Sequence, residues 1–271
     1  MLRKLLLLSS LLALQAVHVV HAEGLSLNTE SGWELGLQVS TYGYNEYVNG
    51  DPFMSNKGSK LGLTGTVNYA FEGDLSNWYL SLDGRYAAGT VDYEGSGTMN
   101  GQRDTVSDYR LLVGKDIPFD DYLFSFYSGA GVRALFNDAR GITSTGAIGY
   151  RRDSSYVYLP LGITHRIGLG ASDARLSTTM EYDHFMEGQQ VSHVTDAGAD
   201  TDLKNYQRRG FGVRLMLAYE TEDWSLGGFY NYWNIQQSED STFISLPYIV
   251  TGYEPLNITR EVGLQLKYRF R

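Results

Sequence analysis

The sequence predicts an all-β protein, a transmembrane antiparallel up-and-down β-barrel of about ten strands. Apolar and polar residues alternate along repeated segments, the links between these segments alternate in length, and charged residues occupy the face opposite the apolar one. The 271 residues include 31 glycines, 21 tyrosines and no cysteine, with a net charge of -9. The lack of cysteine excludes disulfide scaffolds and thiolate metal sites, and the acidic charge argues against nucleic-acid partners.

The first 22 residues have the composition of an export signal. Arg3 and Lys4 precede an apolar run, and residues 20–22 (Val-His-Ala) form a cleavage-like site. The apolar run is short for a spanning helix, so a retained membrane anchor is the less favoured alternative. We therefore expect a signal peptide over 1–22 and a barrel over 23–271.

A period of two marks the strands in the rest of the chain. Leu35 and Leu37, for example, alternate with Gly36 and Gln38, which is the pattern of a strand with one apolar face. Segments of about ten residues or more suit tilted strands that cross a bilayer. The pattern predicts strands over 32–47, 59–72, 77–94, 104–116, 122–138, 153–168, 174–188, 206–220, 224–238 and 259–271.

The links between these segments are short and long in strict alternation. The long links are 48–58, 95–103, 138–152, 189–205 and 239–258. Membrane barrels have tight turns at one end and longer loops at the other. A soluble sandwich with charged outer faces is the alternative, but it gives no reason for this alternation.

The two faces of the strands predict lipid outside and charge inside. Nearly every strand carries charged residues on its polar face, too many for a core that excludes water. Closing the strands with the apolar face outward satisfies the backbone groups in lipid. The predicted lumen charges are Asp83, Arg85, Asp108, Arg110, Arg133, Arg166, Glu181, Arg214, Glu261 and Lys267.

A lumen of this size permits two interpretations. Ten strands lie near the barrel size that side chains fill, which favours a network of paired charges. The alternative is a narrow channel for small polar solutes, which needs a continuous water path. Aromatic residues near both strand ends predict two interfacial girdles, with Trp33 and Tyr79 in one and Tyr42 and Tyr44 in the other.

The last strand resembles the terminal strand of bacterial outer-membrane proteins. Residues 261–270 (Glu-Val-Gly-Leu-Gln-Leu-Lys-Tyr-Arg-Phe) alternate and end in an aromatic residue, although Arg271 follows. The resemblance implies a bacterial outer-membrane location, contact with lipid and lipopolysaccharide, and recognition by the barrel assembly machinery. A ten-stranded barrel also resembles the omptin proteases and certain neisserial adhesins, and no subfamily is identified.

The resemblance to omptins implies an acidic pair and an Asp-His pair facing each other across the barrel mouth. This chain offers Asp92 and Glu94 on its third strand, and Asp183 and His184 on its seventh. Such groups hydrolyse a peptide bond when histidine and acids position a water molecule. Adjacent residues on a strand point to opposite faces, however, so an omptin-like surface protease remains an alternative.

The long link 189–205 contains two weaker patterns. Ser192 and His193 are adjacent in a polar stretch, which is typical of a loop rather than a catalytic site. Asp196, Asp200 and Asp202 do not have the spacing of a fixed calcium site. We therefore expect no metal and no cofactor.

The last long link contains an apolar segment, residues 243–250 (Phe-Ile-Ser-Leu-Pro-Tyr-Ile-Val). Exposed apolar patches mark partner sites, but folding back as a lid or lengthening a hairpin is the favoured alternative. The candidate interaction residues are Phe243, Ile244, Leu246, Tyr248 and Ile249. The whole sequence favours a non-enzymatic structural or surface-interaction barrel, whose loops contact an extracellular ligand or protein.

Overall fold

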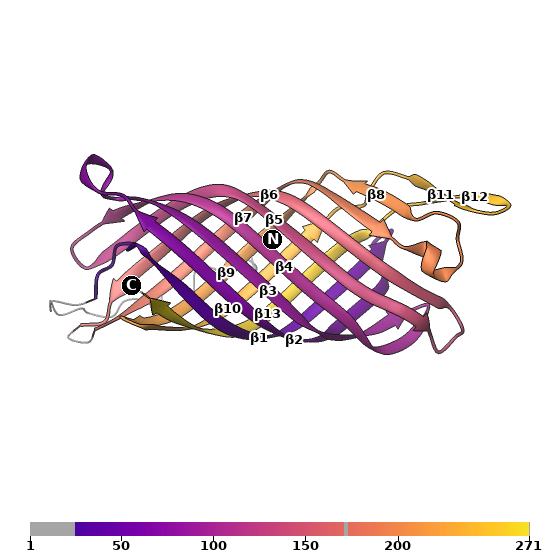
Figure 1. Ribbon diagram of the computed structural model, residues 1–271, viewed down its shortest axis with the longest axis horizontal. Helices are drawn as coiled ribbons and strands as arrows, with labels where there is room; N and C mark the ends of the chain where they lie inside the picture. Colours follow the sequence, from indigo (N-terminus) through magenta and orange to yellow (C-terminus); the bar gives the residue numbers. More distant parts are fainter. Residues whose placement is uncertain (1–24, 171–172, 271) are drawn as a thin grey trace.

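A computed structural model describes residues 25–170 and 173–270, and these form a closed antiparallel barrel of ten strands (Figure 1). The predicted signal peptide and Arg271 lie outside the described residues. β1 pairs with β13 and β6 pairs with β7, so every barrel strand has two neighbours. The barrel strands are β1 (Gly32–Val48), β2 (Asp51–Ala70), β3 (Trp78–Gly95), β4 (Gly97–Pro118), β5 (Tyr122–Ile142), β6 (Ile148–Gly168), β7 (Ala174–Ser192), β9 (Gly210–Thr221), β10 (Trp224–Ile235) and β13 (Leu256–Phe270).

Shorter elements complete the described part of the chain. Two 3-10 turns are η1 (Gly73–Leu75) and η2 (Val194–Ala197). β8 (Leu203–Gln207) pairs with the end of β7, whereas β11 (Ser241–Ser245) and β12 (Tyr248–Gly252) form a separate hairpin. No helix among the described residues is long and apolar enough to cross a membrane. We call the end with β8, β11 and β12 the loop end, and the opposite end the short-turn end (Figure 1).

The predicted fold class is confirmed. At the loop end most strands are longer than predicted, whereas β9 and β10 are shorter there. β1 and β2 continue through the predicted link 48–58 and meet at Asn49 and Gly50, which have φ values of 54° and 89°. β3 and β4 continue through 95–103 in the same way and are separated by Ser96. Backbone pairing persists beyond the apolar belt, where the side chains no longer alternate between apolar and polar.

An apolar belt covers the outside of the barrel. Leu37 on β1 lies opposite Leu63 on β2 and Leu266 on β13, and all three side chains are exposed. A water-soluble barrel would instead bury such a row, so the belt contacts lipid. The other exposed members include Leu35, Val39, Leu61, Val67, Leu82, Leu111, Val113, Val132, Leu159, Leu161, Leu217, Leu226, Val262 and Leu264.

Aromatic residues border this belt at the short-turn end, but part of the girdle prediction is wrong. Trp33 stacks on Phe270 with ring centroids 3.8 Å apart. Tyr79, Tyr42 and Tyr44 are buried inside the barrel instead. Each has the sequence parity of its strand's lumen-facing residues, and an unbroken strand alternates its faces without exception.

Candidate functional site

The lumen contains a polar cavity of about 250 Å³ toward the short-turn end. Its wall combines charged groups of both signs with hydroxyl and amide groups, and the tail residues Asn28, Thr29 and Glu30 border it as well. The charged strand residues that line it are Glu34, Asp83, Arg85, Asp108, Arg110, Arg166, Arg175, Glu181, Arg214, Glu220, Lys267 and Arg269.

Two arginines cross the lumen at mid-height. Arg110 contacts Asp83 at 3.1 Å and Glu181 at 2.6 Å. Arg214 contacts both Asp183 and Asp108 at 2.8 Å, and Glu181 at 3.1 Å. These residues come from β3, β4, β7 and β9, so the ion pairs join strands that are distant in the sequence.

The remaining predicted lumen charges also lie inside the barrel. Arg85 pairs with Glu261, which accepts a 2.6 Å hydrogen bond from the Ser40 hydroxyl. Arg133 is nearly fully buried, with a guanidinium nitrogen 3.6 Å from Asp108 Oδ2. The other two pairs are Lys267 with Glu34 at 3.6 Å and Arg166 with Asp116 at 3.7 Å.

Residues 26–29 lie across the short-turn end of the lumen. Thr29 N–H donates to Asp116 Oδ2 at 2.5 Å, and Arg166 donates to the carbonyl oxygen of Leu27 at 3.1 Å. Arg175 donates to the carbonyl oxygen of Ser26. Sequence reasoning missed these contacts, because residues 26–29 carry no charge and are too few to show an alternating pattern that would assign them to the lumen.

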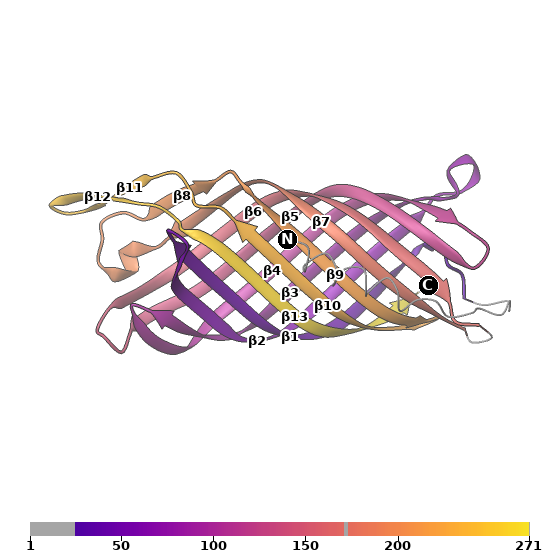
Figure 2. The ribbon, with the colours of Figure 1, turned by 180° about the vertical axis from the view of Figure 1, so that it is seen from behind.

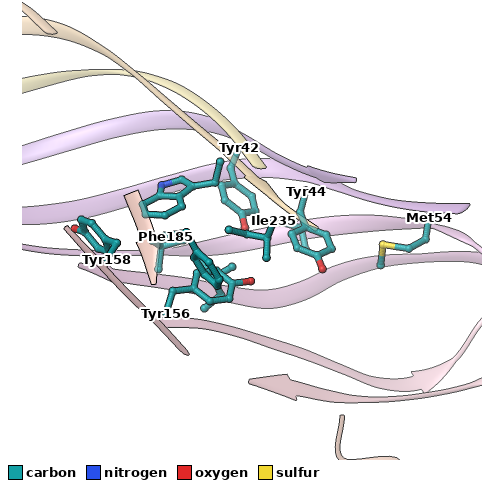
Figure 3. Close-up of a cluster of buried hydrophobic side chains, with 11 residues drawn as sticks. Tyr42, Tyr44, Met54, Tyr156, Tyr158, Phe185 and Ile235 are labelled. Carbon is teal, nitrogen blue, oxygen red and sulfur yellow. The ribbon is translucent and has the colours of Figure 1, made fainter. Parts of the chain in front are cut away.

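An aromatic layer fills the lumen between this cavity and the loop end. Tyr158 and Trp233 are completely buried, with ring centroids 5.0 Å apart. Figure 3 shows Tyr42, Tyr156 and Ile235 gathered inside the barrel. The layer consists of Tyr42, Tyr44, Met54, Val91, Val106, Leu135, Tyr156, Tyr158, Phe185, Trp233 and Ile235.

Glycine makes room for this layer. Tyr158 on β6 lies opposite Gly131 on β5, and a Cβ atom at Gly131 would lie 2.2 Å from Tyr158 Cζ. The ring can therefore lie directly against the neighbouring strand. The sequence indicated a lumen filled by ion pairs. The aromatic layer was not predicted, because tyrosine is also typical of interfacial girdles and Tyr42 and Tyr44 were assigned to one.

A second buried charge cluster lies on the loop-end side of the aromatic layer. Arg152 contacts Glu254 at 2.8 Å and also pairs with Glu46. The Tyr44 hydroxyl is 3.0 Å from Glu46 Oε1 and 2.9 Å from Glu254 Oε1. Sequence reasoning did not select these residues. Both carboxylates are buried and partnered, which differs from an open acidic pair that activates water.

The omptin-like candidates do not converge in the structure. Asp183 is buried in the lumen against Arg214, whereas His184 is exposed on the outer face of β7. Asp92 is exposed and accepts a 2.9 Å hydrogen bond from Gly101 N–H, and Glu94 is exposed as well. The proposed Asp-His pair fails because adjacent residues of an unbroken strand face opposite sides.

His193 instead lies between two carboxylates above the barrel. Its Nδ1 is 2.7 Å from Asp202 Oδ2, and its Nε2 is 3.1 Å from Asp153 Oδ2. Partial burial disfavours the imidazolium, but the hydrogen bonds to Asp153 and Asp202 outweigh burial and raise the pKa of His193. Both ring nitrogens are engaged, so this histidine is a structural bridge rather than a free base. The adjacent Ser192 is buried.

The acidic residues of the same loop also have protein partners. Hydrogen bonds from Arg151 lower the pKa of Asp196 to about 2, and Arg151 Nε lies 2.8 Å from Asp196 Oδ2. Asp200 Oδ2 accepts a 2.7 Å hydrogen bond from Leu246 N–H. Within the described residues, no group of three or more histidine or acidic side chains is arranged to hold a metal ion.

The apolar segment 243–250 forms the hairpin of β11 and β12. Figures 1 and 2 show that this hairpin projects beyond the barrel rather than covering its mouth as a lid. The side chains of Leu246, Tyr248 and Ile249 are 75%, 70% and 76% exposed. Ile244 is also exposed, whereas Phe243 is half-buried.

Comparisons with known proteins identify relatives of the fold only. No protein-family model and no curated protein matches the chain. The structure is similar to the outer membrane protease OmpT from Escherichia coli, with a TM-score of 0.60 and 11% identity over 90% of this chain and 100% of that chain. The translocator domain of the autotransporter NalP from Neisseria meningitidis aligns with a TM-score of 0.42 and 11% identity, over 89% and 90% of the two chains. The protein thus has the closed, ten-stranded transmembrane barrel fold of a bacterial outer-membrane protein.

Proposed function

We propose that the protein is a bacterial outer-membrane barrel that binds an extracellular partner through the β11–β12 hairpin, without catalysis and without solute flow. The exposed apolar tip of this hairpin is the observation that carries the proposal. Its position beyond the loop end suits an encounter with another molecule outside the cell (Figure 2). Lipid and lipopolysaccharide surround the barrel in this proposal, and the barrel assembly machinery inserts it.

The energetics favour a partner that covers the tip. Leu246 and Ile249 are each about three-quarters exposed, and full burial of such a side chain contributes roughly 1.5–3 kcal/mol. Two such side chains are enough to form the centre of a small hot spot, because a few buried residues dominate most interfaces.

The closed lumen argues against the channel alternative. Trp233, Tyr158 and Ile235 are completely buried, and they lie between the polar cavity and the loop end. Ions would have to cross this apolar layer without hydration, which is costly. The separation of Asp183 from His184 likewise argues against the omptin-like protease.

The proposed function is tested by panning a random peptide library on the barrel in lipid nanodiscs. We expect enriched apolar peptides that bind the wild type but not a Leu246→Ser/Ile249→Ser variant, because the variant keeps the hairpin but loses its apolar tip. Enrichment that is equal on both proteins, or absent from both, would contradict the proposal.

The two alternatives have their own readouts on the same preparation. Stable conductance steps of the wild type in a planar bilayer would identify a channel. Cleavage of casein that is lost in an Asp183→Asn variant would identify a protease. We expect neither.

A further inference from the structure

The β11–β12 hairpin has one covered edge and one open edge, and the open edge determines what kind of partner fits. Building on the proposed function, we infer that the partner is an extended, uncharged polypeptide segment that adds to β12 as a third strand. An added strand gains affinity from main-chain hydrogen bonds and specificity from alternate side chains.

The covered edge belongs to β11. Ile244 N–H donates to the Thr201 hydroxyl at 2.8 Å, and the carbonyl oxygen of Ile244 accepts from the N–H groups of Asp200 at 2.8 Å and Thr201 at 3.2 Å. The backbone groups of Ile244 therefore point away from β12. The loop that contains η2 thus occupies this edge.

The open edge belongs to β12 and follows from the register. Ile244 lies opposite Ile249, so this is a pair that exchanges no backbone hydrogen bonds, and the N–H and C=O groups of Ile249 also point away from the partner strand. Thr251, two residues later, points its backbone N–H and C=O groups in the same direction. Among the described residues, these outward groups of Ile249 and Thr251 have no backbone partner.

The root of the hairpin holds this edge in place. Asn205 Nδ2 donates to the carbonyl oxygen of Gly252 at 3.3 Å, and Glu254 N–H donates to the Ser238 hydroxyl at 2.9 Å. Ser238 N–H returns a 3.0 Å bond to the carbonyl oxygen of Glu254. A strand that is already fixed loses little conformational freedom when a partner binds.

The chemistry of the hairpin selects polypeptide over lipid or a polyanion. Residues 241–252 contain no charged side chain, so no electrostatic attraction favours lipopolysaccharide or an anionic membrane. Insertion of the hairpin into a bilayer would carry the open backbone groups of Ile249 and Thr251 into lipid without partners, which is costly. A polypeptide strand satisfies these groups and covers Ile249 at the same time.

The test uses Thr251, because its N–H points only toward the open edge. A Thr251→Pro variant deletes that donor and leaves the β11–β12 ladder intact, since proline is tolerated where the N–H faces solvent. A Thr251→Val variant keeps the donor and serves as the matched control. Both proteins are placed in zwitterionic lipid nanodiscs, and their folding is checked by heat-modifiable migration in gels.

The probe is a fluorescent, end-blocked peptide of alternating threonine and valine, and binding is read by anisotropy. We expect wild type and Thr251→Val to bind it alike, and Thr251→Pro to bind about tenfold more weakly, as the loss of a main-chain hydrogen bond predicts. The same peptide methylated on alternate amide nitrogens should lose affinity for the unaltered protein. This second arm involves no change to the barrel.

Each other outcome identifies a different error. If Thr251→Pro and the methylated peptide bind as well as their controls, strand addition is wrong. If the Leu246→Ser/Ile249→Ser variant nevertheless loses binding, the proposed function stands with a partner that docks on side chains alone. If no variant changes binding, or the peptide does not bind, both proposals fail. Hairpin-dependent binding to protein-free vesicles, or dimers abolished by Thr251→Pro, would replace the peptide by lipid or by a second copy.

Discussion

Arg214 is the residue on which the lumen network depends most. It contacts Asp108, Glu181 and Asp183, and its guanidinium carbon lies 5.3 Å from the centroid of the Tyr158 ring. These carboxylates are almost completely buried, so the surrounding arginines supply the opposite charge that water would otherwise screen. A buried ion pair adds little net stability over apolar packing, but removing one partner leaves an uncompensated charge.

We therefore expect Arg214→Ala to lower the free energy of unfolding by about 3–5 kcal/mol. Arg214→Lys should have a smaller effect, because lysine keeps the charge but not the planar fork. Urea unfolding of the barrel in lipid vesicles, followed by tryptophan fluorescence, measures this change. The control is Arg140→Ala, which breaks the 2.7 Å pair with Asp138 at the exposed loop end. Equal effects of the two alanine variants would contradict the proposed role of Arg214.

The direction of each predicted lumen charge could be derived from sequence, but its partner could not. Alternation along β3 and β4 places Asp83, Arg85, Asp108 and Arg110 on the polar face. The shared face does not say which of these charges pair. Asp83 pairs with Arg110, whereas Arg85 reaches Glu261 on β13. Such choices depend on strand register and barrel closure, which a period of two does not specify.

At the scale of elements, one loop joins the barrel to the hairpin. Asp153 on β6 and Asp202 bind His193, while Asp200 and Thr201 bind Ile244 of β11. The protonation state of His193 therefore affects how firmly this loop is held against the covered edge of the hairpin. A neutral imidazole has one N–H and can donate to only one of the two carboxylates.

We expect the loop over residues 193–202 to loosen as pH rises through the raised pKa of His193. The folded pKa lies above the ordinary value of 6.5, so the stabilisation is complete below that value and is lost as pH increases. Hydrogen exchange of these amides, corrected for its intrinsic pH dependence, measures the opening. His193→Gln should remove the pH dependence, and a wild type with the same protection on both sides of the transition would contradict this role.

The elements also show where sequence prediction ends. Lipid imposes the alternation that marks the middle of each strand, so the ten strands could be predicted there. Beyond the belt, Phe53 and Lys57 continue β2 with no apolar period, and the backbone pairs with β1 all the same. The β11–β12 hairpin was predicted as an apolar segment, but its projection depends on contacts with a loop distant in sequence.

For the molecule as a whole, the apolar belt sets the depth of the barrel in the membrane. Leu63 and Phe53 both point outward on β2, yet Leu63 belongs to the row with Leu37 and Leu266, whereas Phe53 lies near the β1–β2 turn. Leu63 therefore lies in the lipid, and Phe53 lies beyond it toward the loop end.

We expect Leu63→Arg to destabilise the barrel in phosphatidylcholine vesicles by about 2–4 kcal/mol, and Phe53→Arg by roughly 0–1 kcal/mol. Both variants introduce arginine on the same face of β2. The difference between their free energies of unfolding therefore reports the depth of each position in the membrane. Reversible urea titration provides both values. A larger cost at Phe53 would mean that the belt has been placed at the wrong height.

In the proposed function, the buried layer around Tyr158 and Trp233 closes the lumen on the loop-end side of the polar cavity. A small solute that reached this cavity from the short-turn end would then leave by the same end. Under that proposal, the occupancy of the cavity follows the solute concentration in one compartment alone, and the barrel dissipates no gradient across the membrane. The proposal thus lets the β11–β12 hairpin be displayed at one surface while the permeability barrier stays intact.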